Sequence, residues 1–366
     1  MQQKLSLVFF LILFSASTIS FSQQMEITID SSFKTNKNFF PANNKLIQYT
    51  GRIDFRNEMA PRMWSPAVYI TLKFKGDNIT AVINDEELWN KNHNYLEIIL
   101  DNDKKRIQTK YKTNYINIKN LKNVEHVLRI CKNTESNIGF IEYAGVYCDA
   151  LLKPTAKPKR KIEFIGNSIA CGTGSDESEI PCGKGVWQDQ HNAYLAYGPI
   201  TAKALNAQWQ VSAVSGIGLI HSCCNMNVVM PPVFNKIDLR GDSIVWDFAN
   251  YQPDVITVSL GQNDGVQDST AFTTAYIDFV KTLRKNYNKA TIVLLTSPMA
   301  DNKLRAFLKS QIAAVINYMS ANGENNMGSF VFEKSYTSGC DAHPNIKEHQ
   351  EIANKLTTYL KKKMGW

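Results

Sequence analysis

The chain has 366 residues, of which 44% are hydrophobic and 20% are charged, and its formal net charge is +8. This length allows two ordinary domains or one large domain, and the composition is that of a soluble globular protein with enough apolar residues for real cores. The basic excess is spread along the chain and no segment resembles a nucleic-acid-binding module, so we expect no nucleic-acid partner.

Residues 1–22 are predicted to be a signal peptide that is removed before Gln23. One lysine precedes an apolar run from about Leu5 to Phe14, and Ser20 and Ser22 fit a small-x-small cleavage site. The apolar run is well short of the ~20 residues that span a bilayer, which argues against a transmembrane anchor. We therefore expect an exported protein, periplasmic or extracellular, with no stable membrane insertion.

Residues 23–152 are predicted to form an antiparallel β-sandwich domain, of which the jelly-roll is one arrangement. In the run VYITLKFKG, from Val68 to Gly76, alternate residues fall on an apolar face and the others on a second face. Similar short runs separated by polar turns recur at 78–85, 94–100, 106–113, 114–118, 125–132 and 139–149. Such domains on exported enzymes often bind carbohydrate, but a packing role is at least as good an interpretation.

The segment KPTAKPKRK, residues 153–161, is basic and contains two prolines. We interpret it as a solvated interdomain linker. A contact with an anionic polymer is the alternative.

Residues 162–366 show a different periodicity and are predicted to form an α/β catalytic domain. Short apolar runs alternate with helix-length segments, which predicts a parallel sheet covered by helices on both faces. The expected strands are 161–166, 208–214, 254–261, 290–298 and 330–335, and the expected helices are 192–207, 274–286, 302–320 and 346–363.

Ser168 is the candidate nucleophile. It lies in KIEFIGNSIACGTG, two residues after the predicted strand stops at Gly166. The carboxyl end of a strand in an α/β domain is where such folds place reactive side chains. The alternative is a turn serine that caps the following segment.

His343, in CDAHPN, is the candidate base, because a serine nucleophile needs a base that a third group orients. Asp341 lies two residues earlier, and residues two apart in an extended segment project to the same side. Its carboxylate is therefore expected to reach the imidazole and to stabilise the imidazolium. The alternative is a polar loop. By contrast, His349 falls inside the last predicted helix, where we expect it to be exposed.

Three groups are candidates for the oxyanion hole: the main-chain N–H groups of Ser168 and Gly216, and the side-chain amide of Asn263. Gly216, in SAVSGIG, and Asn263, in LGQND, each directly follow an apolar strand. Each alone is explained by a strand-terminating turn. Their joint arrangement at one sheet edge favours acyl transfer, in which such donors stabilise the developing charge.

Seven cysteines leave at least one unpaired if no partner chain is involved. Cys171 and Cys182 bracket a Gly-rich loop and are a candidate pair, whereas pairing of the adjacent Cys223 and Cys224 would strain the backbone. His221 beside them suggests a metal ligand set, but no second ligand pair has the usual spacing, so no metal is expected.

Taken together, IGNSIACG, SGIG, LGQND and DAHP resemble the four blocks of the SGNH (GDSL-type) hydrolases. The resemblance implies that Ser168 is the nucleophile, Gly216 and Asn263 are oxyanion donors and His343 is the base. The order of domains, a sandwich before this hydrolase domain, is similar to that of carbohydrate esterase family 2. The segments WDFANYQPDVITVSLGQND and GCDAHPN are also similar to that family. That family removes acetyl groups from plant polysaccharides such as xylan and uses no cofactor.

Two residues depart from the superfamily pattern. Position 167 is Asn where Asp is usual, which we expect to matter little because this residue is not the base. The spacing of Asp341 and His343 is Asp-x-His rather than the commoner Asp-x-x-His. Some family members with this spacing use a backbone carbonyl in place of the acid.

The resemblance also implies a carbohydrate partner, an acetylated polysaccharide or oligosaccharide. Trp187, in the polar loop GKGVWQDQ, is the candidate for stacking on a sugar ring, whereas Trp209 and Trp246 are expected in the core. Two alternatives remain open: a short-acyl esterase acting on lipid or peptidoglycan, and a non-catalytic carbohydrate-binding protein. The sequence does not determine the oligomeric state.

Overall fold

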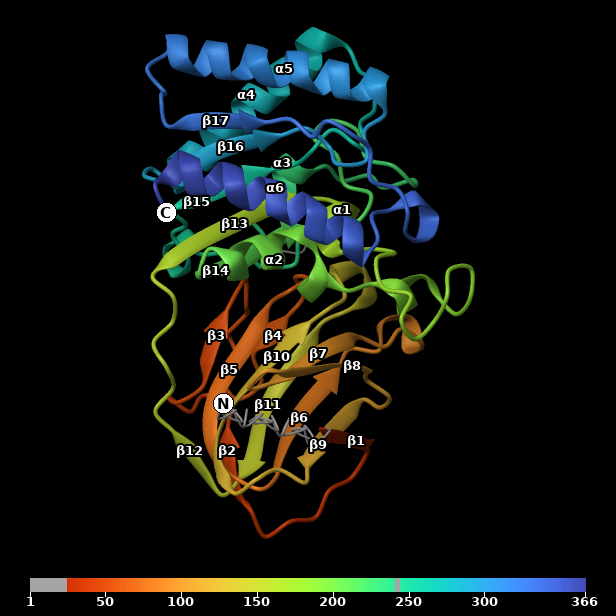
Figure 1. Ribbon diagram of the computed structural model, residues 1–366, viewed down its shortest axis with the longest axis vertical. Helices are drawn as coiled ribbons and strands as arrows, with labels where there is room; N and C mark the ends of the chain where they lie inside the picture. Colours follow the sequence, from red (N-terminus) through yellow and green to blue (C-terminus); the bar gives the residue numbers. More distant parts are fainter. Residues whose placement is uncertain (1–24, 241–243) are drawn as a thin grey trace, which may run out of the picture.

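The computed structural model describes residues 25–240 and 244–366, so the predicted signal peptide lies outside the described residues. Figure 1 shows a sandwich of antiparallel strands at one end of the molecule and a parallel sheet with helices at the other. Both halves have the architecture that the sequence predicts, so the predicted fold class is confirmed.

The sandwich consists of two six-stranded antiparallel sheets. One has the order β1-β9-β6-β11-β2 with β4 beside β11, and the other has the order β12-β5-β10-β7-β8 with β3 beside β5. The strands are β1 (Glu26–Asp30), β2 (Asn38–Pro41), β3 (Gln48–Thr50), β4 (Arg62–Met63), β5 (Tyr69–Gly76), β6 (Ile79–Asp85), β7 (Tyr95–Leu100), β8 (Asp103–Gln108), β9 (Thr113–Lys119), β10 (Val124–Lys132), β11 (Ile141–Cys148) and β12 (Ala150–Leu152).

The alternation along these strands explains the core of the sandwich. Ile70, Leu72 and Phe74 of β5 are all buried, and Ile70 pairs with Ile130 of β10. Side chains two residues apart point to the same face of a strand, so the apolar sets of the two sheets meet between them. Five strands escaped prediction, β1 to β4 and β12, because they are short or lack a clean alternation.

The second half contains a five-stranded parallel sheet of order β14-β13-β15-β16-β17. Helices α2 and α6 pack together on one face, and α4 and α5 pack together on the other. The elements are β13 (Arg160–Gly166), α1 (Ser168–Cys171), α2 (Tyr197–Ala204), β14 (Ala207–Ala213), α3 (Met230–Val233), β15 (Val255–Val258), α4 (Ser269–Asn286), β16 (Thr291–Leu295), α5 (Asn302–Ala321), β17 (Met327–Phe330) and α6 (Ile346–Met364).

This strand order fixes where a site can form. The chain leaves β13 toward β14 on one side and then returns to β15 on the other side. In open α/β sheets, the crevice at such a reversal, at the carboxyl ends of the strands, is the usual place for a ligand. The reversal here lies between β13 and β15, and the turn that carries Ser168 directly follows β13.

Two predicted elements differ from the structure. The last strand, expected at 330–335, is β17 and ends at Phe330. The helix expected at 192–207 is broken into a short 3₁₀ turn and α2. The N–H groups of Ala193 and Tyr194 donate to Asn133 of the sandwich, which holds this segment outside the helix.

The segment between the two halves is held against both of them. Gln48 of the sandwich donates to the Thr155 carbonyl at 3.0 Å, and Gln208 of the α/β domain donates to the Pro158 carbonyl at 2.7 Å. β13 begins at Arg160, so the last two residues of the predicted linker belong to a strand.

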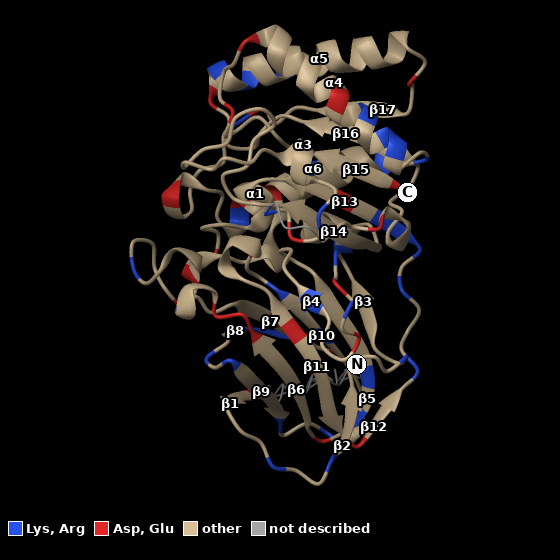
Figure 2. Cartoon of the chain, turned by 180° about the vertical axis from the view of Figure 1, so that it is seen from behind, with Lys and Arg blue, Asp and Glu red and all other residues tan. Residues whose placement is uncertain are grey.

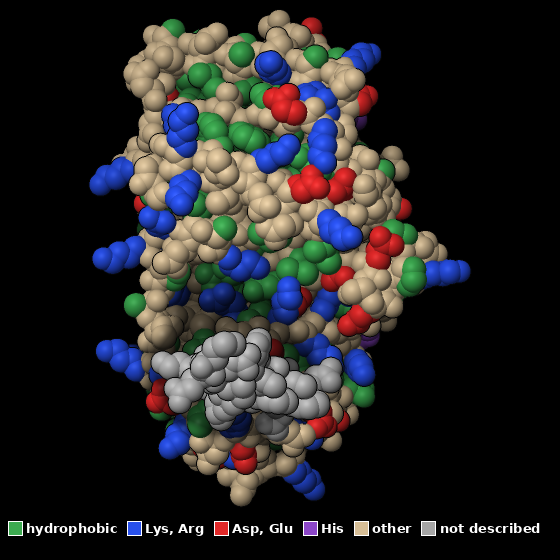
Figure 3. Space-filling view, viewed as in Figure 1, with side chains coloured by type: hydrophobic (Ala, Val, Ile, Leu, Met, Phe, Trp, Pro, Cys, Tyr) green, Lys and Arg blue, Asp and Glu red, His purple; other side chains and the backbone are tan. Residues whose placement is uncertain are grey.

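Charged residues cover both halves. Figure 2 shows Lys and Arg residues spread along the chain, and on the face that Figure 3 shows their side chains do not gather into one patch. Within residues 25–240 and 244–366, none of the helices combines the length and the apolar character needed to cross a bilayer.

One buried ion pair joins the two halves. Arg52 of the sandwich lies 3.1 Å from the carboxylate of Glu163 on β13, and neither side chain is exposed. Arg52 also donates to the Lys236 carbonyl at 2.8 Å, and the Ser212 hydroxyl donates to Glu163 at 2.6 Å. Tyr69 of the sandwich packs against Trp209 of β14 with 4.2 Å between ring centroids and an angle of 35° between the ring planes.

Replacing Arg52 should therefore destabilise the protein strongly. Arg52→Met leaves the Glu163 carboxylate buried without its cation, and such a loss typically costs ~3–5 kcal/mol of the free energy of unfolding. We expect urea unfolding to show this loss, and a double Arg52→Met, Glu163→Leu variant to recover more than half of it. A single variant as stable as the wild type would contradict the prediction.

Candidate active site

Ser168 is presented by a sharp turn at the end of β13. It is the first residue of α1, and the Asn167 side chain caps that helix by accepting the Ile169 N–H at 3.2 Å. Gly172 ends the helix with a φ of 67°, a conformation that favours glycine. The short helix therefore fixes Ser168 at the carboxyl edge of the sheet.

The structure brings Ser168 and His343 together, although they are 175 residues apart in the chain. The distance between Nε2 of His343 and Oγ of Ser168 is 2.8 Å. This is hydrogen-bond geometry between a hydroxyl and an imidazole, which is the contact that a general base needs in order to activate a serine.

The contact made by Asp341 differs from the predicted one. Nδ1 of His343 lies 3.0 Å from the main-chain carbonyl oxygen of Asp341. The carboxylate of Asp341 is exposed, and within the described residues it makes no hydrogen bond to His343. The prediction assumed an extended segment, but Asp341 and Ala342 have φ values of 51° and 55°. This left-handed turn presents the carbonyl to the imidazole instead of the side chain.

The carbonyl contact determines the protonation of His343. Because a carbonyl only accepts hydrogen bonds, Nδ1 carries the proton and Nε2 keeps a free lone pair for the Ser168 hydroxyl. Burial lowers the pKa of His343 below its ordinary value, while the Asp341 carbonyl acts in the opposite direction. The neutral imidazole, which is the form of a general base, therefore prevails at neutral pH.

The other two candidate donors follow the neighbouring strands. Gly216 comes after β14 with a φ of 81°, and a Cβ at this position would lie 2.7 Å from the sulfur of Met226. The positive φ favours glycine, and a Cβ would also require the flexible Met226 side chain to shift. Within the described residues, neither the Ser168 nor the Gly216 main-chain N–H donates to a protein acceptor. Asn263 follows β15, and its amide donates to the Ile217 carbonyl at 2.8 Å.

Asp264 is a buried residue that sequence reasoning missed. Its carboxylate accepts the N–H groups of three successive residues, Leu219 at 2.9 Å, Ile220 at 2.7 Å and His221 at 3.0 Å. It thereby ties the turn after β15 to residues 214–222, which we call the oxyanion loop. The residue stands next to Asn263 in LGQND, so the motif contained it without indicating its role.

The disulfides differ from the sequence expectations. Cys182 pairs with Cys340, whereas Cys171 is a buried free thiol, because the turn that carries His343 folds back onto the 174–186 segment. Cys340 also donates its N–H to the Gly174 carbonyl at 2.8 Å. Cys223 and Cys224, for which we expected mutual pairing to strain the backbone, form a disulfide directly after the oxyanion loop. The bridge to Cys340 thus links the base to a loop beside the nucleophile.

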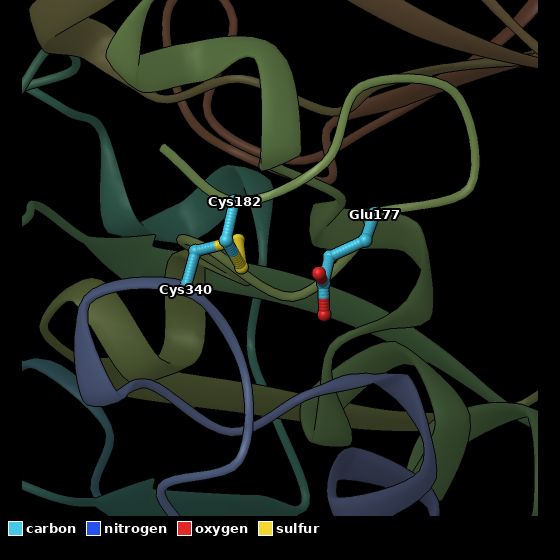
Figure 4. Close-up of side chains that lie close together, drawn as sticks. All are labelled: Glu177, Cys182 and Cys340. Carbon is cyan, nitrogen blue, oxygen red and sulfur yellow. A yellow bond between two sulfur atoms is a disulfide. The ribbon is translucent and has the colours of Figure 1, made fainter. Parts of the chain in front are cut away.

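Figure 4 shows that Cys182 and Cys340 come from separate loops and that Glu177 lies near them. Within the described part of the chain, these three residues are the one set of donors close enough together for a metal ion. Their two sulfurs are bonded to each other, so neither is a free thiolate, which is the ligand that zinc prefers.

Trp187 lies on the surface near the site, with 43% of its area exposed, while Trp209 and Trp246 are buried. Its ring packs edge-on against His191, with 4.3 Å between ring centroids. His191 is fully buried, and burial together with nearby His343 lowers its pKa to about 3. This neutral imidazole is the buried partner against which the Trp187 ring packs.

His349 is buried, contrary to the sequence expectation. Its Nδ1 accepts the Tyr197 N–H at 3.2 Å, so it joins α6 to the start of α2. The helix that carries it buries one face against α2, and His349 falls on that face.

Comparisons with known proteins follow this division of the chain. Residues 49–158 match the family described as carbohydrate esterase 2 N-terminal, and residues 164–324 match the GDSL-like lipase/acylhydrolase family. The fold and these matches define the chain as a GDSL-type hydrolase. With the sandwich in front of that domain, the chain belongs to carbohydrate esterase family 2.

Three relatives illustrate the likeness. An acetylxylan esterase / glucomannan deacetylase of Cellvibrio japonicus is 29% identical over 82% of this chain and 85% of its own length. Cellulase/esterase CelE of Acetivibrio thermocellus is 31% identical over 88% of this chain, which spans only 40% of that longer protein. The solved structure of a family two carbohydrate esterase from Clostridium thermocellum with cellohexaose has a TM-score of 0.79, with 29% identity, covering 87% of this chain and 99% of that one.

Asp341→Asn tests the role of the carboxylate, because asparagine keeps the main-chain carbonyl and tolerates a positive φ. We expect kcat/KM to fall by less than about tenfold, whereas loss of an orienting acid costs about 10⁴-fold in a serine triad. The Asp341 charge raises the pKa of His343, so its removal should move the acidic limb of the pH profile to lower pH. His343→Ala is the control that removes the base. A loss with Asp341→Asn as large as that control's would contradict the observed carbonyl contact.

Proposed function

We propose that this protein is an exported serine esterase that removes O-acetyl groups from plant cell-wall polysaccharides. The observation that carries the proposal is the 2.8 Å contact between Ser168 and His343 at the reversal point of the sheet. A serine paired with an imidazole at this edge is the arrangement of an acyl-transfer enzyme.

In the proposed reaction, His343 takes the proton of Ser168 while Oγ attacks the acetyl carbonyl. The oxyanion receives hydrogen bonds from the N–H groups of Ser168 and Gly216 and from the amide of Asn263. Removal of one such donor typically costs ~2.7–4 kcal/mol in the barrier. His343 then protonates the departing sugar oxygen, and a water activated by the same imidazole releases acetate.

The orienting role falls to the Asp341 carbonyl instead of a carboxylate. A hydrogen bond from Nδ1 to a neutral acceptor still fixes the tautomer and the ring orientation. It stabilises the imidazolium less than a carboxylate would, although the exposed Asp341 charge favours the protonated form from a distance. The proposed machinery is therefore a Ser–His dyad with carbonyl support.

The relatives support a polysaccharide substrate, since two of them are named acetylxylan esterase / glucomannan deacetylase and a solved family two esterase binds cellohexaose. Trp187 offers an exposed ring that we assign to stacking on a sugar of the substrate. The edge-on contact with the buried His191 ring holds the Trp187 ring in a defined orientation.

Export is the proposed fate of the chain. The predicted signal peptide, residues 1–22, supports it, and so does the Cys182–Cys340 disulfide, since such bonds persist in oxidising compartments. The mature chain would then begin at Gln23 and comprise the sandwich domain to residue 152 and the catalytic domain from residue 162.

Acetate release from acetylated xylan and acetylated glucomannan tests this function. The purified protein should release acetate, and its Ser168→Ala variant should be at least about 10³-fold slower because the nucleophile is lost. Both proteins should have the same thermal unfolding midpoint within a few degrees.

The other outcomes separate the alternatives. Turnover of longer acyl esters with no acetate release from either polysaccharide would favour a lipid or peptidoglycan esterase. Polysaccharide binding without any turnover would favour a non-catalytic carbohydrate-binding protein. Wild-type activity in the Ser168→Ala variant would overturn the assignment of the nucleophile.

A further inference from the structure

The sandwich domain sends one buried carboxylate into the catalytic domain. Glu135 follows β10, whose end lies at the boundary between the two halves in Figure 1, and its side chain is fully buried. It caps no helix with its side chain and is not part of the apolar core of the sandwich. Burial of a carboxylate is costly unless it is well bonded, so its contacts indicate why it is there.

The main contact of Glu135 is with the oxyanion loop. Its Oε2 accepts the main-chain N–H of Ser215 at 2.5 Å, across 80 residues of sequence. Ser215 directly precedes Gly216, the proposed oxyanion donor. Burial raises the pKa of Glu135, and a carboxyl oxygen accepts this N–H in either protonation state.

Ser215 is also held through its side chain. Its hydroxyl lies 2.9 Å from the hydroxyl of Thr173, and the N–H of Thr173 donates to the Ser168 carbonyl at 3.1 Å. Glu135 thus completes a chain of contacts that runs through Ser215 and Thr173 to the nucleophile. On the other side of the donor, the Gly216 carbonyl accepts the Cys223 N–H at 2.9 Å. The chain is therefore held both before and after the Gly216 N–H, which limits the direction of that N–H.

Lys132 holds Glu135 in place from within the sandwich. Its buried amine donates to the carbonyls of Trp64 at 3.0 Å, Thr134 at 2.7 Å and Glu135 at 3.1 Å. These bonds fix the turn that carries Glu135. The thiol of Cys171, in α1, lies against the same carboxylate.

We propose that Glu135 is a positioning residue for acyl transfer, through which the N-terminal domain aims the Gly216 N–H at the oxyanion. The sandwich thereby completes the active site and does more than bind or pack. This inference rests on the proposed function, since Gly216 is the donor that Glu135 serves.

Three substitutions test the role with p-nitrophenyl acetate as the acyl probe. Glu135→Met keeps the size and removes the acceptor, Glu135→Gln keeps an acceptor without the charge, and Glu135→Asp withdraws the carboxylate by one carbon. We expect Glu135→Met to lower kcat about 10- to 100-fold with KM within about twofold, because the contact acts on the transition state. Glutamine should restore most of the activity, and aspartate should fall between the two.

Two ligands distinguish the positioning role of Glu135 from a merely structural role: a boronic acid, which mimics the transition state, and a cello-oligosaccharide. A boronic acid that forms a tetrahedral adduct on Ser168 uses the oxyanion donors, so its affinity should fall in parallel with kcat in Glu135→Met. Binding of a cello-oligosaccharide should not change. Arg52→Met is the matched control: it removes another buried interdomain charge, so its folded fraction should keep near wild-type kcat and boronic acid affinity.

Hydrogen–deuterium exchange tests whether Glu135 holds the oxyanion loop without requiring any measurement of turnover. Peptides covering residues 214–222 should exchange at least about tenfold faster in Glu135→Met than in the wild type and Glu135→Gln. If the wild type hydrolyses no acetyl ester, the proposed function fails, and this exchange alone decides whether Glu135 holds the loop.

Several results would overturn the inference. These are a wild-type kcat in folded Glu135→Met, a kcat loss that glutamine does not restore, an unchanged boronic acid affinity, or unchanged exchange in the loop. If Glu135→Met does not fold, Glu135→Asp decides: an intermediate kcat loss with unchanged KM supports the role, and wild-type kcat overturns it.

Discussion

Charges buried between the two domains are the constraint on which the rest of the structure depends. Arg52 and Glu135 of the sandwich are fully buried, and so is Glu163 on β13, the partner of Arg52. Ions that are removed from water need close partners, and Arg52, Glu135 and Glu163 have theirs in the other domain. Neither domain alone supplies the partners of these groups. The two domains therefore pack as one unit, and the residues that support the catalytic edge of the sheet are held in place.

Contacts between the domains and within the catalytic domain explain how the turns at the catalytic edge keep their side chains and N–H groups in position. Ser168, Gly216 and Asn263 each follow a different strand, and turns at strand ends are ordinarily mobile. Here Glu135 supports the oxyanion loop from below, Asp264 ties it to the neighbouring turn, and the Cys182–Cys340 bridge anchors the turn that carries the base. Preorganised donors of this kind are what stabilises charge in a transition state.

Much of the fold and the dyad could be predicted, because both are expressed in local patterns. Alternation revealed most strands of the sandwich, and strand–helix alternation placed Ser168 and His343 at one sheet edge. The role of Asp341 was mispredicted because the amino-acid sequence does not reveal the positive φ values at residues 341 and 342. Glu135 and the partner of Cys182 were out of reach for another reason: their contacts join segments 80 and 158 residues apart, and no local period encodes such pairs.

The Cys182–Cys340 bridge also sets a condition on the order in which the chain matures. Three cysteines that remain thiols, Cys131, Cys148 and Cys171, precede Cys182, whereas its partner lies near the carboxyl end. A chain that entered an oxidising compartment from its N-terminus would expose every wrong partner of Cys182 before the right one. Cys148 is buried in the core of the sandwich, whereas Cys131 is buried in a core that includes residues of the catalytic domain. Burial raises the pKa of both thiols and so suppresses the reactive thiolate. Folding of the sandwich alone therefore protects Cys148, whereas Cys131 is protected only once the catalytic domain packs against it.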